Sequence, residues 1–136
     1  MRISFGADEA TELTAALSQR LREAGHEVVE PLTIGAEWPD VGRAVGESVA
    51  SGGTDLGIVC CWTGTGVSIA ANKVPGVRAA LCVDAETARG ARRWNDANVL
   101  ALSLRLTTPT VAGEIIEAFL SAEPDDSEKD NWSRLE

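Results

Sequence analysis

Five short apolar runs alternate with longer segments of helical periodicity, and this alternation constrains the fold more than any other feature of the sequence. Each run has the length and the aliphatic content of a buried strand. The runs occupy residues 2–6, 26–29, 55–59, 77–82 and 98–102. Strands that are joined through helices pair in parallel, because a helical crossover returns the chain to the starting edge of the sheet. The sequence therefore predicts an α/β fold with a parallel sheet that helices cover on both faces.

Between the runs, apolar residues recur every three or four positions, which is the spacing of the buried face of a helix. The clearest sets are Leu13, Leu17 and Leu21; Val41, Val45 and Val49; and Val111, Ile115, Ala118 and Phe119. Asp84 is expected to cap a further helix that ends near Trp94, and Thr110 to begin the last one. The 136 residues are predicted to form one domain over residues 1–122, followed by a polar tail over residues 123–136.

Charge and cysteine content narrow the partners and the compartment. The formal net charge of -9 argues against a nucleic-acid or anionic-membrane partner, because phosphate groups attract Lys and Arg. The three cysteines (Cys60, Cys61 and Cys82) form neither a disulfide framework nor a metal-binding spacing, which is typical of a reducing compartment. The opening run is too short for a secretory signal, and no run is long enough to cross a bilayer. We therefore expect a cytoplasmic protein.

The run at residues 55–59 leads into a thiol and a glycine-rich turn. Cys61 ends the predicted strand, and Thr63, Gly64 and Gly66 follow it. Ligands of open α/β sheets bind beyond the carboxyl ends of the strands, so this turn is the default site. A thiol beside a helix N-terminus can act as a base or a nucleophile; alternatively, Cys61 is a small buried hydrophobic residue. Neighbouring residues of a strand face opposite sides, so the preceding cysteine would not share the site.

The backbone N–H groups of this turn, with the hydroxyls of Thr63 and Ser68, can hold an anion or a developing oxyanion. The alternative is a tight connection that needs glycine only for a positive φ. Two nucleotide-binding patterns do not fit. A dinucleotide fingerprint would have glycine at position 69, where the chain has Ile69, and a phosphate-binding P-loop would end in Gly-Lys-Ser or Gly-Lys-Thr.

Three polar residues are further candidates, each with a simpler alternative. Asp8 follows the first run and can shuttle a proton or bind a hydroxyl, or it can cap a helix. Asn95 can bind a substrate hydroxyl, although a turn residue is the commoner role. Arg105 is a basic group near the predicted strand ends. His26, the only histidine, lies at a strand start away from them, so no Ser-His-Asp or Cys-His device is available.

Taken together, these segments resemble the ribose-5-phosphate isomerase B and galactose-6-phosphate isomerase family. The resemblance spans most of residues 1–120 and is densest from Cys61 to Arg105. The segments that carry it are Cys61-x-Thr63-Gly64-x-Gly66, Ser-Ile-Ala-Ala-Asn-Lys at 68–73, Val-Arg-Ala-Ala-Leu-Cys at 77–82, Thr87-Ala88-Arg89, and Asn-Asp-Ala-Asn-Val-Leu-Ala-Leu at 95–102.

The resemblance implies a Rossmann-like, three-layer αβα fold with a five-stranded parallel sheet. It implies a homodimer or tetramer with the site at a subunit interface, and neither a metal nor an organic cofactor. The implied reaction is aldose–ketose isomerisation of a small sugar phosphate through a cis-enediolate. In that scheme Cys61 takes the proton next to the carbonyl. Thr63 and the N–H groups from Gly64 to Val67 hold the enediolate oxygens. Asp8 and Asn95 bind the sugar hydroxyls, and Arg105 binds the phosphate.

Several residues depart from the pattern of that family. Glu9 and Trp94 replace two histidines, one near the phosphate and one implicated in ring opening. Trp62 replaces a glycine after the cysteine, and Trp38 replaces a tyrosine. The tail at residues 123–136 lacks the arginine cluster that reaches the partner's phosphate site, but it is still expected to dock on the partner subunit.

These departures shape the expected substrate. A pocket walled by Trp38, Trp62 and Trp94 is predicted, suited to stacking on the apolar face of a sugar; alternatively, the tryptophans fill volume left by a shifted loop. Without the ring-opening histidine, an open-chain substrate such as a four-carbon sugar phosphate fits better than ribose 5-phosphate. Two alternatives stay open, namely a catalytically inactive sugar-binding homologue and an isomerase of an unphosphorylated sugar.

Overall fold

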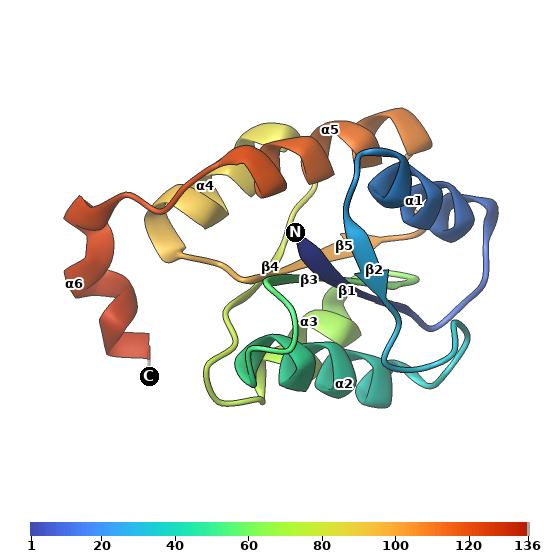
Figure 1. Cartoon of the computed structure of the whole chain (residues 1–136), viewed down its shortest axis with the longest axis horizontal. Helices are drawn as coiled ribbons and strands as arrows, with labels where there is room; N and C mark the ends of the chain where they lie inside the picture. The colour runs from blue at the N-terminus through green and yellow to red at the C-terminus, as the bar shows by residue number, and fades with distance from the viewer. Residues whose placement is uncertain (136) are drawn as a thin grey trace.

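The computed structural model describes residues 1–135 and contains a five-stranded, all-parallel sheet in the order β2-β1-β3-β5-β4 (Figure 1). The strands are β1 (Arg2–Ala7), β2 (Glu27–Val29), β3 (Leu56–Cys61), β4 (Ala79–Leu81) and β5 (Val99–Ser103). The helices between them are α1 (Glu12–Glu23), α2 (Trp38–Ala50), α3 (Thr65–Asn72), α4 (Ala85–Asn95) and, after β5, α5 (Pro109–Ser121). The predicted α/β fold and its parallel sheet are therefore confirmed.

Helices cover both faces of the sheet, so the fold has three layers. Figure 1 shows α1, α4 and α5 over one face and α2 with α3 under the other. The central strand β3 contributes side chains to the hydrophobic cores on both faces of the sheet, because successive side chains alternate. Ile58 and Cys60 lie in the core under α1, α4 and α5, and Val59 and Cys61 lie in the core beside α2 and α3. Every residue of β3 is buried, as expected for a strand with neighbours and helices on all sides.

Side-chain caps decide where the last two helices of the core begin. Asp84 accepts a hydrogen bond from the Thr87 N–H at 2.7 Å and caps α4, as the sequence predicts. Thr108 caps α5, and Pro109 is its first residue, so the predicted start at Thr110 is one residue late. Proline suits that position because its fixed φ matches the helix and its missing N–H has no partner to lose.

The C-terminal segment folds into short helical turns rather than an extended tail. They are η1 (Asp126–Glu128), α6 (Lys129–Trp132) and η2 (Ser133–Leu135). The segment passes beside α4 and extends away from the sheet (Figure 1), and the Asp125 N–H donates to the Arg93 carbonyl at 2.8 Å. Docking of this segment on a partner stays a prediction. None of the helices in residues 1–135 has the length and apolar character needed to span a membrane.

Candidate active site

The carboxyl ends of β1, β3 and β5 lie side by side, and they bring several of the predicted site residues together. In the register of the sheet, Ala7 pairs with Cys60, and Cys61 pairs with Ser103. Asp8, the first residue after β1, donates its N–H to the Cys60 carbonyl at 3.2 Å. Asp8, Cys61 and the glycine-rich turn therefore share one edge of the sheet, which we call the carboxyl edge.

Cys60 and Cys61 are both buried, on opposite faces of the sheet as predicted. Cys60 lies in the core under α1 and α5, and burial raises the pKa of its thiol to about 12, with smaller contributions from Cys61 and Asp8. Cys61 is 5% exposed, lies in the core beside α2 and α3, and directly precedes the glycine-rich turn. Cys60 is therefore a neutral thiol. The position of Cys61 fits both a base at the edge and a small buried residue.

Gly64 shapes the turn that follows Cys61. It is the N-cap of α3 with a φ of +77°, a conformation that favours glycine. A Cβ at this position would lie 2.6 Å from Leu81 Cδ1 and 2.9 Å from the carbonyl carbon of Leu102. Both the backbone conformation and the lack of space therefore require glycine, which explains the glycine-rich sequence without invoking a ligand.

The start of α3 presents N–H groups that nothing else uses. In the described part of the chain, the N–H groups of residues 65–67 have no hydrogen-bond acceptor, and the first helical bond runs from the Ser68 N–H to the Gly64 carbonyl at 3.3 Å. The Thr63 and Thr65 hydroxyls lie 2.7 Å apart at the same place. These donors lie at the positive end of the helix dipole and can bind an anion or a developing oxyanion.

Asp8 lies among other carboxylates. Burial raises the pKa of its carboxyl, the charges of Glu9 and Glu37 raise it further, and its own backbone hydrogen bond lowers it. Glu37, the residue before α2, is a neighbour that sequence reasoning missed, since no spacing links it to Asp8. An anion at this point of the edge would meet repulsion. No group of three or more His, Cys, Asp or Glu side chains within residues 1–135 is arranged to hold a metal ion.

Ser103 and Arg105 extend the carboxyl edge beyond β5. Ser103 Oγ donates to the Trp62 carbonyl at 3.0 Å and accepts from the Leu106 N–H at 3.3 Å. The Arg105 N–H donates to the same Trp62 carbonyl at 3.1 Å, so the turns after β3 and β5 are tied together. The Arg105 guanidinium is exposed and makes no ion pair inside the described chain, which leaves it available to an anion. Ser103 was missed, although its position directly after the fifth run was a signal.

Asn95 and Trp94 lie at the opposite, amino edge of the sheet. They form the last turn of α4, just before β5, whose first residue Val99 pairs with Gly57 near the start of β3. At about 3.3 Å per residue, the step from Gly57 to Cys61 separates the two edges by roughly 13 Å. A single chain therefore does not bring Asn95 together with Cys61.

The two asparagines near this edge have different surroundings. Asn98 uses its whole amide, since Oδ1 accepts from the Arg78 N–H at 2.8 Å and Nδ2 donates to the Gly76 carbonyl at 2.9 Å. Asn95 is exposed, and its carboxamide has no hydrogen-bond partner among residues 1–135. Asn98 is therefore structural, whereas Asn95 is available to a ligand.

The three tryptophans lie apart within a single chain, so the predicted pocket that they wall stays a prediction for the assembled protein. The Trp38 ring lies against Gly66, where a Cβ would be 2.8 Å from Cε3, and it lines a hollow of about 400 Å³ between α2 and α3. Trp94 lies over Gly90 and lines a separate hollow of about 500 Å³ beside β4. Trp62 is 59% exposed after β3. The reason is topological, because Trp94 and Trp62 belong to opposite edges of the sheet.

Comparison with known proteins gives matches over nearly the whole chain. The sequence model of the Ribose/Galactose Isomerase family matches residues 3–135. The galactose-6-phosphate isomerase subunit LacB of Clostridium acetobutylicum is 41% identical over 126 residues, covering 90% of this chain and 73% of that protein. The D-erythrulose-4-phosphate isomerase of Pectobacterium atrosepticum is 38% identical over 128 residues, covering 90% and 84%. The structure of ribose-5-phosphate isomerase B from Clostridium thermocellum gives a TM-score of 0.93 at 38% identity, covering 99% of this chain and 95% of that one.

Proposed function

The chain belongs to the ribose/galactose isomerase family and is a sugar-phosphate aldose–ketose isomerase, and on that premise we propose that Cys61 is its base. The observation that carries the proposal is the position of Cys61, directly before a turn whose N–H groups at residues 65–67 have no acceptor within the described chain. A carbon acid needs a nearby base and fixed dipoles where negative charge grows. The carboxyl edge offers both within a few residues.

The proposed reaction moves one proton between two adjacent carbons. The Cys61 thiolate removes the proton next to the carbonyl, the electrons of the C–H bond form the carbon–carbon double bond, and the π electrons of the carbonyl move onto its oxygen to give a cis-enediolate. Thr63, Ser68 and the first N–H groups of α3 hold the enediolate oxygens. Cys61 then returns the proton to the neighbouring carbon. Asp8 moves the accompanying proton between the two oxygens, which its raised pKa favours because the carboxyl holds a proton more readily.

The site is proposed to be shared between two copies of the chain. Asn95 has an unused carboxamide but lies at the amino edge, so it can act only on a substrate held by another chain. A homodimer in which the amino edge of one copy faces the carboxyl edge of the other would bring Asn95 and Trp94 to Cys61. The C-terminal segment, which extends beyond α4 (Figure 1), is proposed to dock on the same partner.

The proposed substrate is a four-carbon sugar phosphate rather than ribose 5-phosphate. Such a sugar cannot close a ring through its phosphorylated oxygen, so it needs no ring-opening histidine at the position of Trp94. The carboxylates of Glu9 and Glu37 near Asp8 disfavour a phosphate there, which leaves Arg105 as the phosphate ligand on this chain. One relative is a D-erythrulose-4-phosphate isomerase, which agrees with this substrate length.

The test is solvent-deuterium exchange at the carbon next to the carbonyl, followed by NMR. The sugars are D-erythrulose 4-phosphate, ribose 5-phosphate, galactose 6-phosphate and unphosphorylated erythrulose. Exchange with the four-carbon phosphate, and much slower exchange with the others, is the expected result. Binding without exchange for every sugar would identify an inactive homologue. Exchange with ribose 5-phosphate alone would overturn the proposal of a four-carbon substrate. Exchange with erythrulose alone would overturn the proposal that the substrate is phosphorylated.

A further inference from the structure

Three charged side chains hold the turn between α4 and β5, and we call them the Arg78–Asp96–Arg92 clamp. Arg78 Nη2 lies 3.1 Å from Asp96 Oδ2, and Arg78 Nε donates to the Asp96 carbonyl at 2.7 Å. Arg92 Nη1 lies 3.4 Å from Asp96 Oδ1 and donates to the Ala97 carbonyl at 2.6 Å. One carboxylate therefore joins two arginines that come from different segments of the chain.

The backbone of Asp96 ends α4. Its φ of 46° and ψ of 43° lie in the left-handed region, and no other non-glycine residue in the described range 1–135 has a positive φ. The N–H groups of Asp96 and Ala97 both donate to the Ala91 carbonyl, which closes the last turn of the helix. Aspartate is one of the few side chains that adopt this conformation at modest cost. Asp96 thus sets the direction in which the chain leaves α4.

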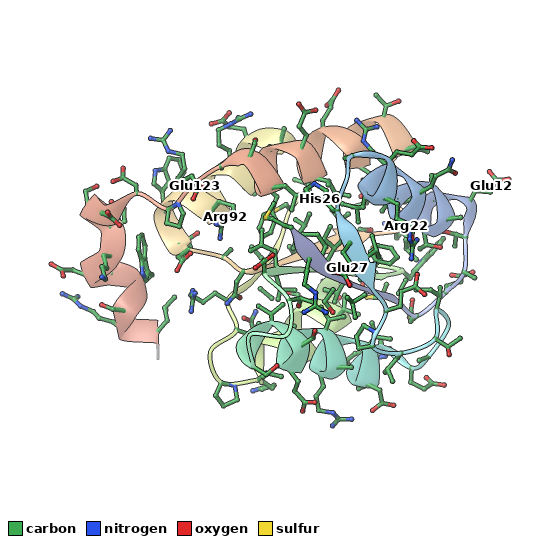
Figure 2. The ribbon with its side chains drawn as sticks, in the orientation of Figure 1. Glu12, Arg22, His26, Glu27, Arg92 and Glu123 are labelled. Atoms are coloured by element: carbon green, nitrogen blue, oxygen red, sulfur yellow. The ribbon has the colours of Figure 1, made fainter. Side chains whose placement is uncertain are left out.

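Arg92 is buried in a way that simple packing does not require. Its Nε has no hydrogen-bond partner in residues 1–135, and its guanidinium lies 5.6 Å from the centre of the Phe119 ring. Figure 2 shows it next to Glu123, which follows α5. Hydrophobic side chains of similar volume usually fill such a place at lower cost than a buried charge. The buried charge of Arg92 is therefore best explained by its ion pair with Asp96 and its hydrogen bond to the Ala97 carbonyl, which fix the turn after α4.

We propose that Asp96 is a positioning residue for Asn95, and that the clamp fixes the Asn95 carboxamide for the substrate in the partner's site. Asn95 is the residue directly before Asp96, and no side-chain hydrogen bond within residues 1–135 orients it. Its orientation therefore depends on the backbone that Asp96 and the two arginines fix. The inference rests on the proposed function, because it assumes that Asn95 binds substrate.

The test combines two substitutions at Asp96 with one at Asn95. Asp96→Asn keeps a residue that tolerates the left-handed conformation but removes the charge, and Asp96→Gly keeps the conformation but removes the side chain. Both variants should raise the KM for D-erythrulose 4-phosphate about tenfold, as expected for a displaced substrate ligand. In an Asn95→Ala background, the same substitutions should have no further effect on KM. Asp84→Ala, which removes the cap at the other end of α4, is the control and should leave KM unchanged.

Amide hydrogen exchange gives a readout that needs no substrate. The Ala97 N–H should exchange faster in both Asp96 variants, while the amides of β5 keep their protection. If Asn95→Ala leaves KM unchanged, Asn95 is not a substrate ligand. The proposed role of Asn95 and this inference would then both be overturned. If Asn95→Ala raises KM but the Asp96 variants match the wild type, only this inference is overturned. An Asp96 effect that adds fully to that of Asn95→Ala would likewise overturn it, since Asp96 would then be merely structural.

Discussion

Cys60 and Cys61 are neighbours in the chain, yet their thiols enter different cores on opposite faces of the sheet. The pleat of β3 separates them, because successive side chains of a strand point to opposite sides. Cys60 is remote from solvent, and its thiol pKa is raised to about 12, so it stays protonated at neutral pH. The pair therefore offers a natural comparison, in which one thiol is proposed to carry chemistry and its neighbour only fills volume.

Cys61→Ala is expected to abolish proton exchange at the carbon next to the carbonyl, because it removes the only base proposed there. Cys60→Ala should keep that exchange within a few fold of the wild type and cost about 1 kcal/mol of unfolding free energy, since it leaves a small cavity. NMR of the sugar in deuterated buffer measures the first effect, and urea unfolding measures the second. Exchange that survives in Cys61→Ala would remove Cys61 from the mechanism.

Gly64→Ala should destabilise the protein more than an alanine at another positive-φ glycine. At Gly64 the new Cβ would meet Leu81 and the backbone of Leu102, whereas at Gly35, with a φ of +105°, it would meet nothing within 4 Å. Gly35→Ala should therefore lower the free energy of unfolding by about 1 kcal/mol, through the strained backbone conformation alone. Gly64→Ala should lower it by about 2–4 kcal/mol, because the new Cβ also meets its neighbours. Urea unfolding of both variants checks the difference. Equal losses would mean that the turn after β3 can shift without cost.

The sequence was sufficient for the sheet and for much of its carboxyl edge. Apolar runs of strand length fix the strands, and their alternation with helices fixes parallel pairing, so Asp8, Cys61 and Arg105 could be assigned to one edge. The alternation of side chains along β3 also predicted the opposite faces of the two cysteines. These features depend on local spacing, which a single sequence contains.

Other features depend on tertiary packing that no local pattern encodes. Glu37 approaches Asp8 only because the loop before α2 passes the end of β1, and its position in the sequence gives no hint of that contact. One chain does not form the predicted tryptophan pocket, so that pocket stays a prediction for the assembled dimer. A residue that precedes a strand lies at the amino edge of a parallel sheet, so Trp94 cannot join Trp62 within one chain. The sequence shows that Glu9 and Trp94 depart from the family pattern. Their effect on the substrate site depends on how two copies of the chain assemble.

Asp8→Asn should stabilise the protein at neutral pH while it lowers the isomerase activity. The pKa of the Asp8 carboxyl is raised above its usual 3.8, so the folded chain binds this proton more tightly than the unfolded chain does. Ionising Asp8 therefore costs stability. The gain from asparagine should be present above the folded-state pKa, shrink as the pH falls through that pKa, and vanish below 3.8.

Thermal unfolding midpoints of Asp8→Asn and the wild type, compared from neutral to acidic pH, measure this gain. Glu9→Gln should reproduce part of it, because the Glu9 charge contributes to the raised pKa of Asp8. A lower midpoint for Asp8→Asn than for the wild type at neutral pH would contradict the assignment, since it would mean that the ionised carboxylate is stabilised by contacts in the folded chain.

Mixing two impaired variants tests whether Cys61 and Asn95 serve one site from different chains. Cys61→Ala is expected to be inactive, and Asn95→Ala is expected to have little activity at a substrate concentration far below its raised KM. When the two chains are unfolded together and refolded, half of the dimers should be mixed, and each mixed dimer has one site with both residues intact, so about a quarter of the wild-type activity should return. Cys61→Ala mixed with Asp8→Asn is the matched control and should recover nothing beyond the residual activity of Asp8→Asn, because both residues lie at the carboxyl edge of the same chain and every site keeps one defect. Recovery in the control, or none with Asn95→Ala, would show that the site is not divided between the two edges in this way.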